Sequence, residues 1–151
     1  MGEITGIPAG YSITGMEVLS GADAPIYGMA TDGNNAILVT ISLDDLIATP
    51  VGTNNGLVLP ISLARDENDD LYSIDIDDDV LYKIDKITGG ATQVGELGLD
   101  FNFGQGMFFD EATGHIISLS YNTVLGDSEM YSIDPQLGLA TSLGTIQPGT
   151  I

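Results

Sequence analysis

A repeated segment constrains the fold of this chain more than any other feature of its sequence. Residues 81–95 read LYKIDKITGGATQVG, and residues 130–144 read MYSIDPQLGLATSLG. Matching Tyr, Ile, Asp, Gly, Ala and Thr residues recur 49 positions apart in the two segments. A third, weaker copy covers residues 38–52, beginning LVTIS and ending ATPVG. A period of about 40–50 residues predicts a fold built from repeated units.

Each copy is preceded by two further segments that have the composition of β-strands. These segments begin at Gly15 and Ile26, at Ile61 and Leu71, and at Gly106 and Ile116. They are rich in Ile, Val and Tyr, and clusters of Asp, Asn and Gly separate them, which is typical of strands joined by turns. Four short strands in each repeat predict an all-β fold, a partial β-propeller of three four-stranded antiparallel blades.

The predicted blades cover about residues 13–52, 57–97 and 101–146 of a single domain, residues 1–151. Residues 3–10 resemble the end of an outer strand and predict one extra N-terminal strand. Three blades do not close a ring, because propellers have about four to eight. Either the chain is a piece of a longer propeller, or copies of it assemble. For the second case we expect a homo-oligomer: a dimer that gives six blades, or an open polymer if head-to-tail contacts fail to close.

A resemblance to a known family rests on two segments. LYKIDKITGGATQVG (81–95) and FNFGQGMFFDEATG (101–114) resemble the repeats of bacterial secreted and cell-surface β-propellers, whose blades read Leu-Tyr-x-Ile-Asp-x-x-Thr-Gly-x-Ala-Thr-x-Val-Gly. The resemblance covers residues 57–146 well and residues 1–56 loosely. It implies an extracellular or cell-surface protein, and the family's shared motifs specify a fold without a catalytic signature. Residues 42–47, SLDDLI, replace the Asp-x-x-Thr-Gly turn in the first blade.

The composition of the chain excludes several classes of binding partner. The chain has 22 acidic and 3 basic residues, a formal net charge of −19 and no cysteine. Three cations cannot neutralise the phosphates of a nucleic acid or an anionic membrane surface, and no apolar run is long enough for membrane insertion. The absence of cysteine excludes disulfides and thiolate chemistry. Residues 1–6 lack a basic and an apolar region, so a signal peptide is absent from this chain.

Acidic residues cluster where turns are predicted. Asp75, Asp77 and Asp79 alternate between the second and third strands of the middle repeat, and a second cluster covers residues 66–70. Carboxylates spaced in this way can converge on Ca²⁺, which prefers six to eight oxygen ligands. The sequence favours turn-forming hydrogen bonds for both clusters. A calcium site at Asp75, Asp77 and Asp79 is kept as the alternative. Asp85 and Asp134 are predicted to open the hairpin to the last strand.

Catalytic motifs are absent from the sequence. His115 is the only histidine, and it follows a Thr-Gly turn at a predicted rim, where it is interpreted as an exposed residue. No nucleophile elbow, phosphate-binding loop or zinc-binding histidine pair is present, so no catalytic or cofactor-binding residue is predicted. The sequence favours a non-catalytic binding or scaffold module that assembles through its blade edges. Two alternatives remain open: a propeller-type lyase or hydrolase with its site at the channel mouth, and a subunit of an extracellular filament.

Overall fold

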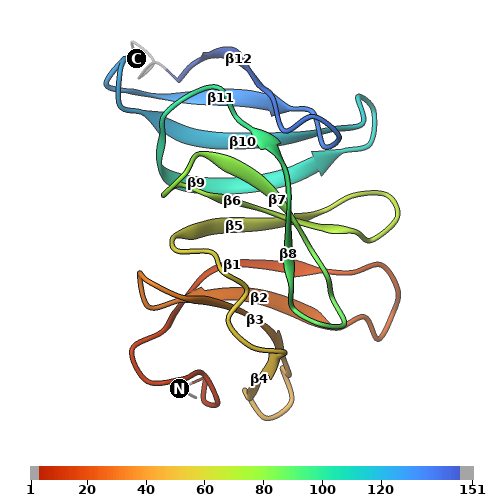
Figure 1. The fold of residues 1–151 in the computed structure, drawn as a ribbon. Coiled ribbons are helices and arrows are strands. Elements are labelled where there is room, and N and C mark those ends of the chain that lie inside the picture. The colour runs from red at the N-terminus through yellow and green to blue at the C-terminus, as the bar shows by residue number, and fades with distance from the viewer. Residues whose placement is uncertain (1–3, 147–151) are drawn as a thin grey trace, which may run out of the picture.

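A computed structural model describes residues 4–146, and all the regular secondary structure in this range is β (Figure 1). Twelve strands form three four-stranded antiparallel sheets, as the repeat predicts. The strands are β1 (Ser12–Val18), β2 (Ile26–Thr31), β3 (Ala36–Ile41), β4 (Ala48–Val51), β5 (Pro60–Arg65), β6 (Leu71–Asp75), β7 (Val80–Ile84), β8 (Ala91–Glu96), β9 (Phe101–Asp110), β10 (His115–Asn122), β11 (Asp127–Ile133) and β12 (Ala140–Thr145). Residues 4–146 include no helix that could cross a membrane.

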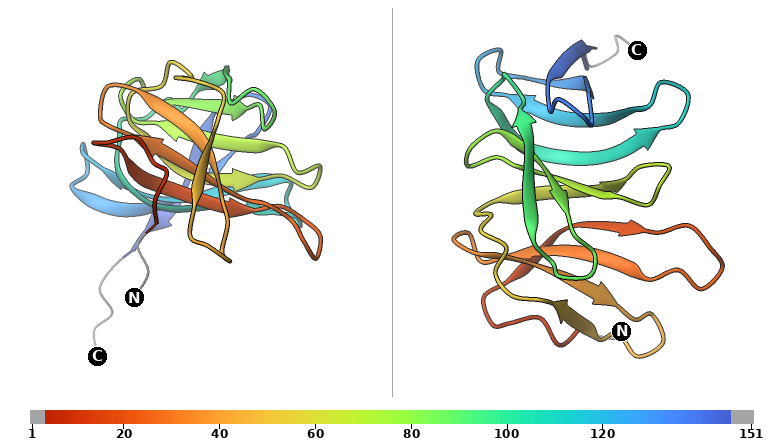
Figure 2. Two further views of the ribbon diagram at one scale, coloured as in Figure 1. Left: turned by 90° about the horizontal axis from the view of Figure 1, so that it is seen from below. Right: turned by 45° about the vertical axis from the view of Figure 1, so that its right-hand side comes forward.

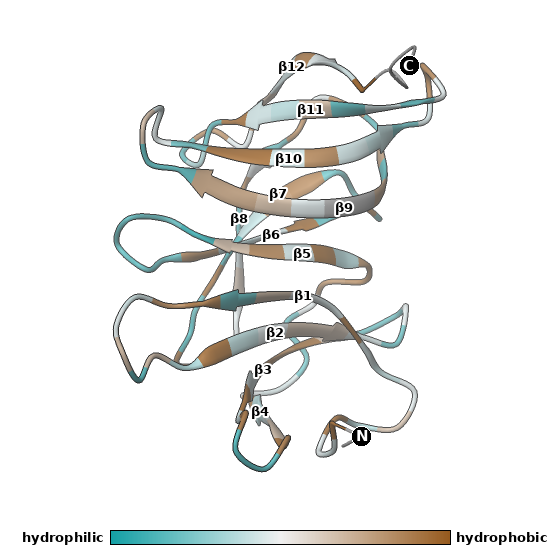
Figure 3. Cartoon of the chain, turned by 180° about the vertical axis from the view of Figure 1, so that it is seen from behind, coloured by the Kyte–Doolittle hydropathy of each residue, from teal (hydrophilic) through white to brown (hydrophobic). Residues whose placement is uncertain are grey.

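The three sheets stack face to face as blades. Blade 1 contains β1–β4, blade 2 contains β5–β8, and blade 3 contains β9–β12. The first strands of the blades lie side by side, with β5 between β1 and β9, and each blade runs outward in chain order (Figures 1 and 2). Apolar strand segments alternate with hydrophilic turns along the stack (Figure 3).

Apolar side chains between the blades form the core. One cluster joins blades 1 and 2 and includes Tyr27, Met29, Leu38 and Ile84. A second cluster joins blades 2 and 3 and includes Tyr72, Ile74, Leu81, Tyr131 and Ile133. The recurring tyrosines therefore pack between blades. Burying these side chains is the main force that holds one blade on the next.

Repeated aspartates close the outer hairpins. The Asp85 carboxylate accepts hydrogen bonds from the backbone N–H groups of Ile87 and Thr88, at 2.8 and 2.9 Å. Asp134 accepts the equivalent bonds from Gln136 and Leu137, at 2.7 and 3.1 Å. These are the predicted turns, in which a short acidic side chain satisfies backbone donors that no strand pairs.

The N-terminal segment makes a single bridge residue where an extra strand over residues 3–10 was predicted; Glu3 lies outside the described residues. Thr5 pairs in parallel with Ile47, and the Ala48 N–H donates to the Thr5 carbonyl at 2.8 Å. Gly6, which follows the bridge, has a φ of +87° and Gly10 has a φ of +88°, so the backbone leaves the extended conformation at both positions.

Residues 4–11 instead follow the path of a connection between blades. The Ala48 N–H bond to Thr5 reproduces the bond from the Ala140 N–H to the Leu97 carbonyl, at 3.0 Å, which ties blade 3 to the connection that precedes it. Ile7 and Tyr11 pack on an apolar cluster on the side of blade 1 that faces away from blade 2. The chain therefore begins with a connection of the kind that elsewhere joins two blades.

Candidate functional site

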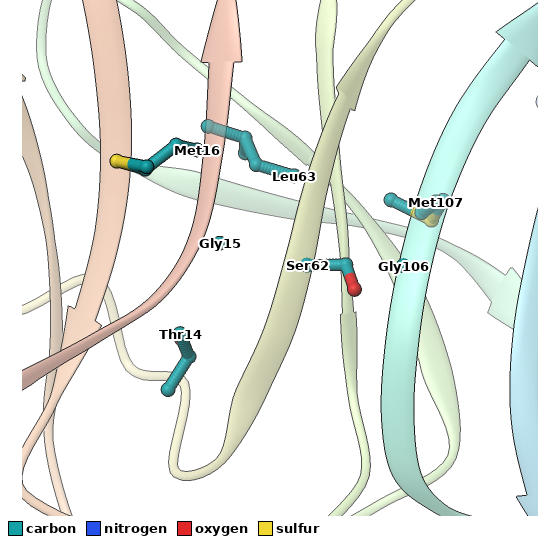
Figure 4. A pocket seen from close by; sticks show the side chains of 7 residues that line it. All are labelled: Thr14, Gly15, Met16, Ser62, Leu63, Gly106 and Met107. Atoms are coloured by element: carbon teal, nitrogen blue, oxygen red, sulfur yellow. The ribbon is translucent and has the colours of Figure 1, made fainter.

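The inner strands of the three blades line a pocket of about 240 Å³ at the centre of the arc (Figure 4). Its lining residues come from β1, β5 and β9 and are small or apolar, apart from two hydroxyls. They are Thr14, Gly15, Met16, Ser62, Leu63, Gly106 and Met107. This position corresponds to the central channel of a propeller, where the enzyme alternative placed its site.

Strand irregularities shape this pocket. The register of β1 shifts between Ile13 and Gly15, and that of β5 shifts between Ile61 and Ala64. Ser62, inside the β5 bulge, has a φ of +60°. The Thr14 hydroxyl donates to the Pro60 carbonyl at 2.6 Å and so holds β1 against β5. The two hydroxyl side chains offer hydrogen bonds, and none of the lining side chains is an acid, an amine or an imidazole.

Of the predicted calcium ligands, Asp75 ends β6, and Asp77 and Asp79 lie in the turn between β6 and β7. The carboxylates of Asp75 and Asp79 accept hydrogen bonds from backbone groups. Asp75 is 2% exposed, and its carboxylate accepts hydrogen bonds from the N–H groups of Val58 and Leu59, at 2.7 and 2.9 Å. It also accepts one from the Asp77 N–H at 3.1 Å. Asp79 accepts a hydrogen bond from the Phe101 N–H at 2.8 Å. Asp75 and Asp79 therefore hold the two connections that lead into blades 2 and 3.

Burial raises the pKa of the Asp79 carboxyl, and the nearby Asp100 and Asp78 carboxylates add to this effect. Within residues 4–146, no group of three or more His, Asp or Glu side chains is arranged to hold a metal ion. The second acidic cluster also forms a turn, because Asp66 accepts hydrogen bonds from the Asn68 and Asp70 N–H groups, at 2.8 and 3.0 Å. Calcium at Asp75, Asp77 and Asp79 stays a prediction.

His115 lies at the start of β10, away from the central pocket. Its Nδ1 atom is 2.7 Å from the Ser132 hydroxyl, on the side of blade 3 that faces away from blade 2. The side chain is half-buried, so it is less exposed than the sequence predicted.

That side of blade 3 is apolar and uncovered within the described chain. We call it the blade 3 outer face and define it by the side chains of Phe103, Phe108, Ile117, Leu119, Met130 and Leu143. Phe108, Met130 and Leu143 are 56%, 40% and 57% exposed. The sequence predicted open ends without naming these residues. Aligning the strands of the three repeats could have identified them.

No protein-family model matches the chain, and no curated protein matches it either. Similarity to solved structures is clear. A chain in the nidogen/laminin complex matches with a TM-score of 0.68 and 15% identity, over 93% of this chain and 51% of that chain. Staphylococcus aureus virginiamycin B lyase with quinupristin matches with a TM-score of 0.61 and 15% identity, over 94% and 44%.

A third neighbour is regucalcin from Agrobacterium tumefaciens, a calcium-binding protein. It matches with a TM-score of 0.55 and 14% identity, over 80% of this chain and 41% of that chain. These neighbours are β-propeller proteins, and the likeness shows that this chain has a propeller fold. The chain spans about half the length of the structures it matches.

Proposed function

We propose that the chain is a non-catalytic binding or scaffold module of an exported or cell-surface protein, and that it completes its propeller with a second copy of itself. In this assembly the blade 3 outer face of one copy packs on blade 1 of the other. Two chains supply six blades, and the ring closes by two equivalent contacts. One observation carries the proposal: the blade 3 outer face has apolar residues at the positions that are buried against the next blade in blades 1 and 2.

The repetition is seen in one cross-strand pair of each blade. Met29 pairs with Leu38 in blade 1 and Ile74 pairs with Leu81 in blade 2, and all four side chains are fully buried against the next blade. In blade 3 the equivalent pair is Leu119 and Met130. Met130 is 40% exposed because no blade follows it in the described chain. Blade 3 therefore presents the surface that blades 1 and 2 use for blade packing.

Blade 1 offers a matching surface. Met16 and Val18 are 59% and 50% exposed. They lie with Ile26 on the face of blade 1 that points away from blade 2. The outer part of the same face is already covered by residues 4–11, which follow the path of a connection between blades. A blade that arrives from another copy would need to cover only the inner part.

The length of the chain favours a second copy as the partner that covers the blade 3 outer face. This chain covers 51% of the matched chain in the nidogen/laminin complex and 44% of the lyase. Two copies therefore make a particle of the size of one neighbour. Large apolar patches on a protein surface mark interaction sites, and burial of these side chains supplies the association energy against the repulsion of two chains of charge −19.

The test is the mass of the native particle. We expect light scattering at micromolar concentration to give two chains for the wild type and one folded chain for Met130→Asp, because the new carboxylate would be buried without a partner. Leu43→Asp is the matched control, since Leu43 is 69% exposed in the β3–β4 turn of blade 1, and it should remain dimeric. A folded wild-type monomer would overturn the proposal. An unlimited polymer would favour the filament.

A further inference from the structure

A cleft of about 670 Å³ lies on the side of blade 3 that faces blade 2, separate from the central pocket. Its walls are residues 98–100 of the connection into blade 3, the β10–β11 turn and strands β11 and β12. The same connection inserts Leu97 between blades 2 and 3, as the 52–59 connection inserts Leu57 between blades 1 and 2. The cleft therefore lies beside the packed core and opens to solvent. The side chains of Leu99, Val124, Leu125 and Ala140 make much of the cleft apolar.

A buried carboxylate lines this apolar cleft. Glu129 is 5% exposed, and it accepts hydrogen bonds from the Tyr131 hydroxyl, from Asn122 Nδ2 at 2.9 Å and from the Ser142 hydroxyl at 3.0 Å. These donors, with Tyr131 contributing most, lower the pKa of the Glu129 carboxyl. The side chain therefore stays ionised at neutral pH, and Asp100 adds a second carboxylate to the lining of the cleft.

The chain supplies no cation to this carboxylate. Its three basic residues all belong to blade 2 or to the turn that follows β7, and each is engaged there. Lys83 Nζ is 2.6 Å from Asp70, Arg65 Nη1 is 3.3 Å from Asp69, and Lys86 donates to the Asp69 carbonyl at 2.6 Å. Buried carboxylates in proteins are usually paired with a cation. Among the described residues, Glu129 has no such cation.

The repeat shows that a carboxylate at this position is a specific feature of blade 3. The positions equivalent to Glu129 in blades 1 and 2 are Ile37 and Val80, each four residues before the isoleucine that ends the third strand of its blade. These two side chains are 6% and 5% exposed. Packing of the blades therefore calls for an apolar residue here. Blade 3 has Glu129 instead, together with a complete set of hydrogen-bond donors and an open cleft.

We propose that this cleft binds a small organic cation, with its ammonium group on Glu129 and its apolar body against Leu99, Val124 and Leu125. An ammonium group supplies the missing positive charge and donates hydrogen bonds, and the apolar walls favour a hydrocarbon body over a hydrated metal ion. The site is formed by blade 3 and the connection that precedes it, so it does not depend on ring closure. The strongly negative charge of the molecule also attracts cations to it.

The probe is benzylammonium, and its neutral analogue benzyl alcohol is the comparison. Titration into labelled protein, followed by NMR at about 0.15 M NaCl to screen general attraction, should give saturable shifts at the cleft for benzylammonium alone. Glu129→Gln keeps hydrogen-bond acceptors and removes the charge, and it should weaken binding about tenfold or more. Glu111→Gln makes the same charge change on an exposed turn and should bind like the wild type.

Two results would overturn the proposal: no saturable shift in the wild type, or equal binding by Glu129→Gln and the wild type. If Glu129→Gln does not fold, Leu125→Trp provides the second variant. Leu125 is 58% exposed at the cleft, so a larger side chain there fills the cleft and leaves Glu129 in place. This variant should keep the melting temperature and lose the binding. Binding that persists in it would also contradict the site.

Discussion

Gly95 sets the spacing between blades 2 and 3 by having no side chain. A Cβ atom at this position would lie 1.9 Å from the Leu137 carbonyl oxygen, a distance no real contact reaches. A Cβ atom at Gly52 would likewise lie 1.9 Å from the Thr88 carbonyl oxygen of blade 2. The glycine near the end of the outer strand in blades 1 and 2 is thus explained by the backbone of the next blade.

We expect Gly95→Ala to lower the free energy of unfolding by about 1–3 kcal/mol, because the added methyl group forces two blades apart. Urea unfolding measures the change. Gly106→Ala is the control, since no atom lies within 4 Å of the site a Cβ would occupy there. Gly106→Ala should keep or slightly raise the free energy of unfolding, because alanine restricts the unfolded backbone. Equal losses from the two variants would contradict the close approach as the cause.

At the scale of the element, the β6–β7 turn acts as an anchor for the connection into blade 2. We expect Asp75→Ala to cost about 1–3 kcal/mol of unfolding free energy, because the Val58 and Leu59 N–H groups lose their acceptor. Asp77→Ala changes an exposed side chain of the same turn and should stay within about 0.5 kcal/mol. Thermal and urea unfolding distinguish the two variants, and equal stability of both would contradict the anchoring role.

The same turn gives the calcium prediction its test. Calcium that binds the folded state alone raises the melting temperature by mass action. A calcium site at Asp75, Asp77 and Asp79 would give a higher melting temperature in millimolar Ca²⁺ than in excess chelator, and no difference in the double variant Asp77→Asn, Asp79→Asn. A wild type with no shift and no heat of binding would exclude the site. A shift that survives in the double variant would place the ion elsewhere.

Elements governed by local sequence could be predicted, and those governed by distant partners could not. The strands and the turns at Asp85 and Asp134 follow from patterns within one repeat, and the structure has them. The bonds of Asp75 join it to residues 16 and 17 positions away, which no local pattern indicates. The sequence analysis did not single out Glu129, because a repeat is recognised by the positions that match between its copies and Glu129 does not match Ile37 or Val80. Of the strand predicted over residues 3–10, the described residues form only the bridge at Thr5, because the backbone turns at Gly6.

At the scale of the whole molecule, charge opposes assembly and apolar burial favours it. Each chain carries −19, so two chains repel each other at low ionic strength. Salt screens this repulsion and leaves hydrophobic burial intact. We expect sedimentation velocity to show more dimer at about 500 mM NaCl than at about 10 mM. Oligomers that fall apart as salt rises would show that ion pairs, and not apolar faces, hold the copies together.

The hydrogen bond between Thr5 and Ala48 gives blade 1 the same kind of entry as blade 3. It places before blade 1 the backbone contact that Leu97 and Ala140 make where the chain passes from blade 2 to blade 3. Each of these joints is formed by a carbonyl group that precedes a blade and the N–H group that begins the outer strand of that blade. Because backbone groups alone form the bond, the joint is the same in two repeats whose side chains differ.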